Sequence, residues 1–140
     1  MNKILYLSFC FFLILPLSSI AQSNINQKAI DAAKQICDCT KVSLSKNNID
    51  VVKLAEIFKS YSKNNKLSSV NQTNIGKLNK QLDLNYSAIE NDIYNCRSQF
   101  AEKYKLYLKN KEFLSKVEEI INNNPYTAGP KLIKSLAKKI

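Results

Sequence analysis

The sequence contains no histidine and no tryptophan, and the first of these absences removes several kinds of functional site at once. Without histidine the chain cannot form a Ser-His-Asp triad, a histidine-ligated zinc site or a haem attachment site of the C-x-x-C-H type. It also lacks the side chain whose charge ordinarily changes near neutral pH. Catalysis, metal coordination and pH sensing that depend on histidine are therefore excluded.

Glycine and proline are also scarce, with two glycines and three prolines in 140 residues. A fold of many short strands needs more of these turn residues, so the scarcity argues against one. Apolar residues instead recur three and four positions apart, which is the period of an amphipathic helix. The pattern predicts helices over about 25–44, 49 or 50 to 62, 69–84, 86–108, 111–123 and 131–140. It leaves open whether 86–108 and 111–123 are continuous or are separated by a cap at Asn110.

Five or six amphipathic helices with short polar links predict an all-α fold, a compact helical bundle. No internal repeat and no long low-complexity linker divides the sequence. We therefore expect a signal peptide at 1–21 and a single helical domain at 22–140. Removal of 21 residues from 140 leaves 119, which is enough for one hydrophobic core.

The N-terminus has the three regions of a cleavable signal peptide in the expected order. Lys3 gives a short positive segment, residues 4–17 form an apolar run, and residues 19–21 form a cleavage site with small first and last side chains. The stretch 4–21 only just reaches the length of a membrane-spanning helix, and Pro16, Ser18 and Ser19 interrupt it. We therefore expect an exported chain, periplasmic or secreted, that begins at Gln22.

Positive charge dominates the chain, and nearly all of it comes from lysine. The formal net charge is +10, and removal of Lys3 with the signal peptide leaves about +9, to which arginine contributes only Arg97. The planar guanidinium of arginine pairs with phosphates and reads guanine edges, whereas lysine acts as a point charge. The composition therefore predicts solubility and loose attraction to anionic surfaces, and no nucleic-acid partner.

Three cysteines remain after cleavage, because Cys10 lies in the signal peptide. An oxidising compartment favours one disulfide and one leftover thiol. Cys37 and Cys96 fall within the apolar stripes of their predicted helices, whereas Cys39, about 200° round from Cys37, falls toward an edge. We therefore favour a Cys37–Cys96 disulfide, which would close a loop of about 59 residues and stabilise the fold by roughly 2–4 kcal/mol. A Cys39–Cys96 disulfide stays open as the alternative.

The same three sulfurs allow a second interpretation. Cys37, Cys39 and Cys96 could bind copper(I), which prefers soft thiolates. Cys39 could instead resolve a disulfide formed at Cys37, as in thiol-disulfide exchange. Because C-x-C is an unspecific motif and no βαβ pattern surrounds it, we predict no metal site and no cofactor. Thiol exchange or copper(I) binding is kept as the alternative function.

Two other features have both a functional and a structural interpretation. The last predicted helix has aliphatic residues on one side and lysines on the other, which suits an anionic membrane surface. It is short and has no aromatic anchor, so packing against the bundle is favoured over peripheral membrane contact. The acidic residues Glu90 and Asp92 point to different sides of their helix and are interpreted as a solvated face. The lysines of the last predicted helix are Lys131, Lys134, Lys138 and Lys139.

These observations predict a small exported helical protein that is not an enzyme and is stapled by one disulfide. We expect it to bind, or to support structurally, a protein partner or a component of the cell envelope. A C-x-C in a first helix and a third cysteine in a later one, behind a signal peptide, resembles exported proteins of bacteria with an outer membrane. This resemblance implies a location only, and the oligomeric state is not predicted.

Overall fold

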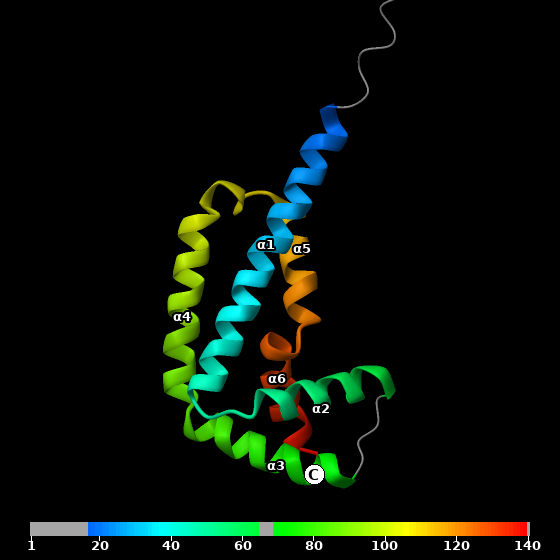
Figure 1. Cartoon of the computed structure of the whole chain (residues 1–140), viewed down its shortest axis with the longest axis vertical. Coiled ribbons are helices and arrows are strands. Elements are labelled where there is room, and N and C mark those ends of the chain that lie inside the picture. The colour runs from blue at the N-terminus through cyan, green and yellow to red at the C-terminus, as the bar shows by residue number, and fades with distance from the viewer. Residues whose placement is uncertain (1–16, 65–68, 140) are drawn as a thin grey trace, which may run out of the picture.

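Helices account for almost all of the residues that the computed structural model describes, which are 17–64 and 69–139 (Figure 1). No strand occurs within these ranges, so the predicted all-α class is confirmed for this part of the chain. A short 3-10 helix, η1, separates α4 from α5. The elements are α1 Leu17–Lys46, α2 Val51–Asn64, α3 Ser69–Leu84, α4 Tyr86–Lys103, η1 Lys105–Tyr107, α5 Lys111–Asn122 and α6 Pro125–Ala137.

The long helix α1 is central to the arrangement of the helices (Figure 1). It packs against α4, α5 and α6, and α4 runs beside it in the opposite direction. α2 and α3 cross the foot of this arrangement, and both pack on α6. The chain thus has one end built from α1, α4 and α5 and another in which α6 holds α2 and α3 against the foot of α1.

The core at the α6 end collects the apolar stripes of α2, α3 and α6. Leu54, Ile57, Ile75 and Ile133 are completely buried there. Burial of such side chains contributes about 1.5–3 kcal/mol each, which is what holds short helices that would not be stable alone. The cluster consists of Leu44, Ile49, Leu54, Ile57, Ile75, Leu78, Leu82, Ile89, Ile133 and Leu136.

The core at the other end combines very small and very large side chains. α1 contributes three completely buried alanines, and their small size lets α5 approach α1 closely. Phe113 of α5 fills the centre, with the rings of Phe100, Tyr104 and Tyr107 at centroid distances of 6.5, 5.8 and 5.3 Å. The alanines are Ala29, Ala32 and Ala33.

α1 ends in a Schellman motif at the polar stretch where the sequence predicts its end. Asn48 adopts a positive φ of 59°, a conformation that asparagine accepts better than most residues. Ile49 N donates to Leu44 O at 3.0 Å and Asn48 N donates to Ser45 O at 3.1 Å. Leu44 and Ile49 both enter the core, as is typical of this motif. The motif therefore turns the chain from α1 into α2 while keeping both apolar ends buried.

Three predicted helix boundaries differ in the structure, and the first is the start of α1, which lies at Leu17 and not near residue 25. α4 ends at Lys103 and α5 begins at Lys111, and the Asn110 side chain caps α5 by accepting from Phe113 N at 2.9 Å. The last helix begins at Pro125 and not at Lys131, because the Asn124 side chain caps it by accepting from Tyr126 N. An Asn-Pro pair that ends one helix can equally begin the next, since proline is well suited to a first helical position.

The signal-peptide prediction falls mostly outside the described residues. Residues 1–16, with Lys3 and most of the apolar run, are not among them, and residues 17–21 lie in the first turns of α1. Cleavage after Ala21 therefore stays a prediction. Within 17–64 and 69–139, no helix is both long enough and apolar enough to cross a membrane.

Candidate functional site

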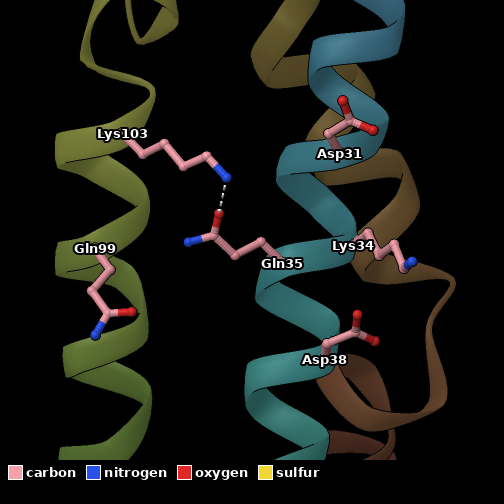
Figure 2. Close-up of a pocket in the computed structure, with 6 residues that line it drawn as sticks. All are labelled: Asp31, Lys34, Gln35, Asp38, Gln99 and Lys103. Carbon is pink, nitrogen blue, oxygen red and sulfur yellow. Dashed lines mark hydrogen bonds between the residues drawn. The ribbon is translucent and has the colours of Figure 1, made fainter.

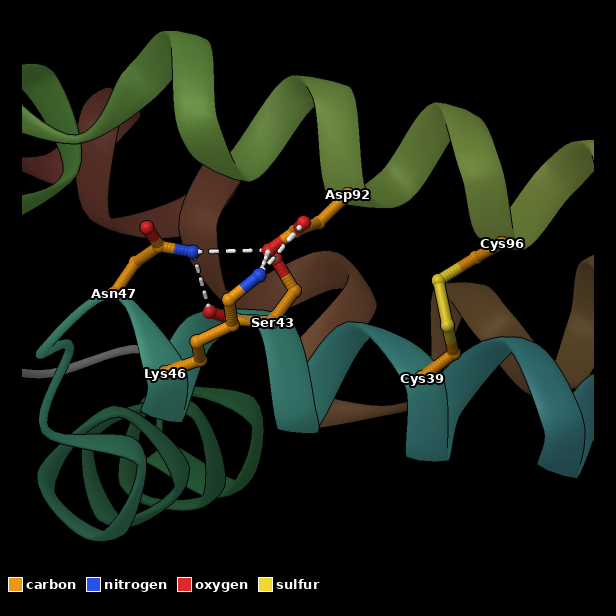
Figure 3. A network of polar contacts seen from close by, with 6 residues as sticks. All are labelled: Cys39, Ser43, Lys46, Asn47, Asp92 and Cys96. Carbon is orange, nitrogen blue, oxygen red and sulfur yellow. Dashed lines mark hydrogen bonds and ion pairs between the residues drawn. A yellow bond between two sulfur atoms is a disulfide. The ribbon is translucent and has the colours of Figure 1, made fainter.

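A disulfide joins α1 to α4 through Cys39 and Cys96, whose Cα atoms are 6.2 Å apart (Figure 3). Cys37 is buried and is not bonded to another cysteine. The expectation of one disulfide and one leftover thiol is confirmed, whereas the favoured Cys37–Cys96 pairing is wrong and the alternative pairing forms.

The reason for this pairing lies in the direction from which α4 approaches α1. Both helices carry apolar stripes, and a Cys37–Cys96 disulfide would require these two stripes to face each other. The stripe of α1 that contains Cys37 instead faces α5 and α6, and α4 packs on the other side of α1. Cys39, two residues and about 200° further round the helix, lies on that side. The bridge therefore forms at Cys39, the residue predicted to lie at the edge of the apolar stripe.

Two hydrogen bonds between the antiparallel helices α1 and α4 lie on either side of the bridge. One turn along α1 from Cys39, Ser43 Oγ donates to Asp92 Oδ2 at 3.2 Å (Figure 3). One turn in the other direction, Lys103 Nζ donates to Gln35 Oε1 at 3.1 Å (Figure 2). We call this row, which pairs residues 35, 39 and 43 of α1 with 103, 96 and 92 of α4, the α1–α4 seam.

Asp92 is the polar centre of the seam. Its carboxylate accepts from Lys46 Nζ at 3.2 Å and from Asn47 Nδ2 at 3.2 Å, in addition to Ser43 (Figure 3). The hydrogen bond from Lys46 is the main cause that lowers the pKa of Asp92 below its ordinary value, with further contributions from Ser43 and Asn47. The interpretation of Asp92 as a purely solvated residue missed this role. Asp92 lies four residues before Cys96 and therefore on the same side of the helix, which is the signal in the sequence that it faces the same neighbour.

Cys37 lies away from the seam, on the side of α1 that faces α6. Burial is the main cause that raises the pKa of its thiol; a hydrogen bond with Thr127 opposes the shift and the charge of Asp38 adds to it. A protonated, buried thiol is a poor nucleophile and a poor metal ligand. Cys37 lies beside Thr127 of α6 and is not joined to Cys39 or Cys96, which are bonded to each other. In the described part of the chain, no three His, Cys, Asp or Glu side chains converge in a way that could hold a metal ion.

Two hollows adjoin the seam, and neither gathers catalytic groups. The smaller, of about 180 Å³, lies against the Cys39–Cys96 bridge and is below the usual size of a small-molecule site. The larger, of about 610 Å³, is an open shelf beside Lys103 (Figure 2). Its carboxylates, Asp31 and Asp38, lie two helical turns apart, about 10 Å along the axis of α1.

The predicted basic side of the last helix is only partly free. Lys134 Nζ forms an ion pair with Asp83 at 3.3 Å and lies 4.6 Å from the centre of the Tyr86 ring. The apolar side of α6 is buried in the core through Ile133 and Leu136. The residues that an interfacial helix would insert into a membrane are thus already packed. Lys131, Lys138 and Lys139 are exposed.

Comparison of the chain with protein-family models, with curated proteins and with solved structures finds no match.

Proposed function

We propose that this chain is a small exported protein without enzymatic activity, which uses a disulfide-locked helical frame to bind a protein partner or another component of the cell envelope. The observation that carries the proposal is the Cys39–Cys96 bridge in register with the Ser43–Asp92 hydrogen bond. A disulfide set within a continuous helix–helix contact is a structural staple, and such bonds persist in oxidising compartments. The N-terminal segment with signal-peptide features is the route to such a compartment.

The seam also explains why rigidity would serve binding. A bridge between residues 57 positions apart restricts the unfolded chain and fixes α4 against α1. A preorganised surface loses less conformational entropy when a partner binds. The frame would therefore present its exposed helix faces in one fixed arrangement.

The rival function is thiol-disulfide exchange or copper(I) binding by the three cysteines. It requires Cys37 to reach either the bridge or a metal shared with Cys39 and Cys96. Cys37 contacts Thr127 on α6, whereas the bridge lies on the flank that faces α4. These opposite directions favour the binding frame over the rival.

A copper(I) titration and a disulfide-exchange assay test the proposal on the purified exported chain. We expect no stoichiometric copper in competition with a chromogenic copper(I) chelator, and a Cys39–Cys96 bridge that persists in millimolar glutathione. Cys37→Ser is the matched variant, because it keeps the bridge and removes the third sulfur. One copper per chain that disappears in Cys37→Ser, or repeated turnover of a disulfide substrate, would establish the rival instead.

A further inference from the structure

A groove of about 1040 Å³ runs along α2 and ends at the start of α6. Its apolar lining comes from Val52, Ala55 and Phe58 of α2 and from Pro125 and Tyr126 of α6. From Val52 to the last lining residue of α2, Lys63, the helix rises about 17 Å, roughly three turns. This shape is long and open, so it fits an extended or helical segment better than an enclosed small molecule.

α2 carries on this side a large apolar residue, Val52, that the fold itself leaves exposed. Leu54 and Ile57 are completely buried and account for its packing, whereas Val52 is 65% exposed. An isolated exposed valine is ordinary, but Val52 continues into a groove with half-buried Phe58 and Tyr126. The groove therefore offers a continuous apolar floor to a partner.

The rim of the groove is positive. Glu56 is its one lining carboxylate and is already paired with Lys53, whose Nζ lies 2.6 Å from Glu56 Oε2. Lys59 and Lys63 are exposed and form no ion pair within the described part of the chain. Lys41 adds a further positive charge beside the floor, 5.1 Å from the centre of the Tyr126 ring. An occupant with carboxylates would complement this rim.

We propose that the α2–α6 groove binds an acidic amphipathic helix of a protein partner, with its apolar side on Val52 and Phe58 and its carboxylates toward Lys59 and Lys63. This rests on the proposed binding function and specifies its surface. An apolar stripe at helical spacing would contact the apolar lining of α2 from Val52 to Phe58, about 9 Å or just under two turns, as in other helix-in-groove complexes.

Selection from a displayed library of random amphipathic peptides tests this assignment, with the exported chain as target and Val52→Asp as counter-target. We expect enriched peptides with apolar residues three and four apart and a net negative charge. Their binding should weaken about tenfold in the Lys59→Glu/Lys63→Glu variant, because two attractions become repulsions. The control Lys28→Glu/Lys111→Glu makes the same change of net charge far from the groove and should alter binding less than about twofold.

Three results would overturn the groove assignment. They are no enrichment above the counter-target, enriched peptides without acidic residues, and equal weakening by both charge-reversal pairs. Binding to phosphatidylserine vesicles through Lys59 and Lys63 would assign the rim to a membrane instead. Circular dichroism checks that each variant is folded, and the salt dependence of peptide binding to the unmodified chain repeats the charge test without substitution. Failure here with a copper-free, redox-inert chain would leave the binding frame itself standing.

Discussion

At the scale of single residues, Phe113 is the side chain on which the end formed by α1, α4 and α5 depends most. It is completely buried and contacts three other rings. We expect Phe113→Ala to lower the free energy of unfolding by roughly 3–5 kcal/mol, since it leaves a large cavity. Leu114, its neighbour, is 39% exposed, and Leu114→Ala should cost less than about 1 kcal/mol. Urea unfolding of both variants checks this; equal losses would contradict it.

Cys37 gives a second prediction at this scale, concerning pH. Its pKa in the folded protein lies above its ordinary value of 9.0 because of burial. The unfolded chain therefore loses its thiol proton first as pH rises, which favours unfolding. The contribution of Cys37 is fully present below about pH 9 and is lost as pH rises through its raised pKa. Measured from about pH 7 to about pH 10, the stability of the wild type should fall relative to Cys37→Ala; a constant difference would rule this explanation out.

At the scale of elements, the two glycines differ in what surrounds them. A Cβ on Gly129 of α6 would lie 3.0 Å from Leu54 Cδ1, a completely buried side chain of α2. Overpacking of about 1–3 kcal/mol should exceed the gain in helix propensity of about 1 kcal/mol, so Gly129→Ala should destabilise. Gly76 of α3 is exposed and has nothing within 4 Å, so Gly76→Ala should stabilise by about 0.5–1 kcal/mol. Thermal melting should show opposite shifts, and shifts of the same sign would contradict the packing described.

α4 is the helix that depends most on the bridge, because α1 is its principal packing partner. In the Cys39→Ser/Cys96→Ser variant we expect hydrogen exchange to accelerate most in α4, while α2, α3 and α6 serve as internal references. Cys37→Ser is the control that keeps the bridge. Equal acceleration of hydrogen exchange in all helices would show that the bridge does not stabilise α4 in particular.

Helix positions could largely be predicted from the sequence, whereas some helix ends could not. The range 69–84 and the start at residue 86 match α3 and α4, because periodic apolar residues and an interrupting Asn85 are local signals. The start of α6 was placed six residues late. Asn124 and Pro125 form a helix start as readily as a stop, and Gly129 is tolerated inside the helix because it packs against Leu54.

At the scale of the whole molecule, the limit of sequence-based prediction is the arrangement of helices around α1. That one disulfide forms could be predicted from three cysteines and the predicted signal peptide. Its pairing could not, because Cys37 and Cys39 differ only in which flank of α1 they occupy, and the side on which α4 packs is a long-range property. The same arrangement decides the role of Asp92, which has a partner only where α4 meets the end of α1.

Cys39 and Cys96 form the disulfide that joins α1 to α4, and Cys37 takes no part in it. Cleavage at the N-terminal side of aspartate tests this directly, because Asp38 lies between Cys37 and Cys39. After denaturation and alkylation without reductant, mass spectrometry should find the peptide 38–49 joined to 92–140, and the peptide 31–37 alkylated and free. A peptide 31–37 joined to either of the others would show that Cys37 takes part in the bridge.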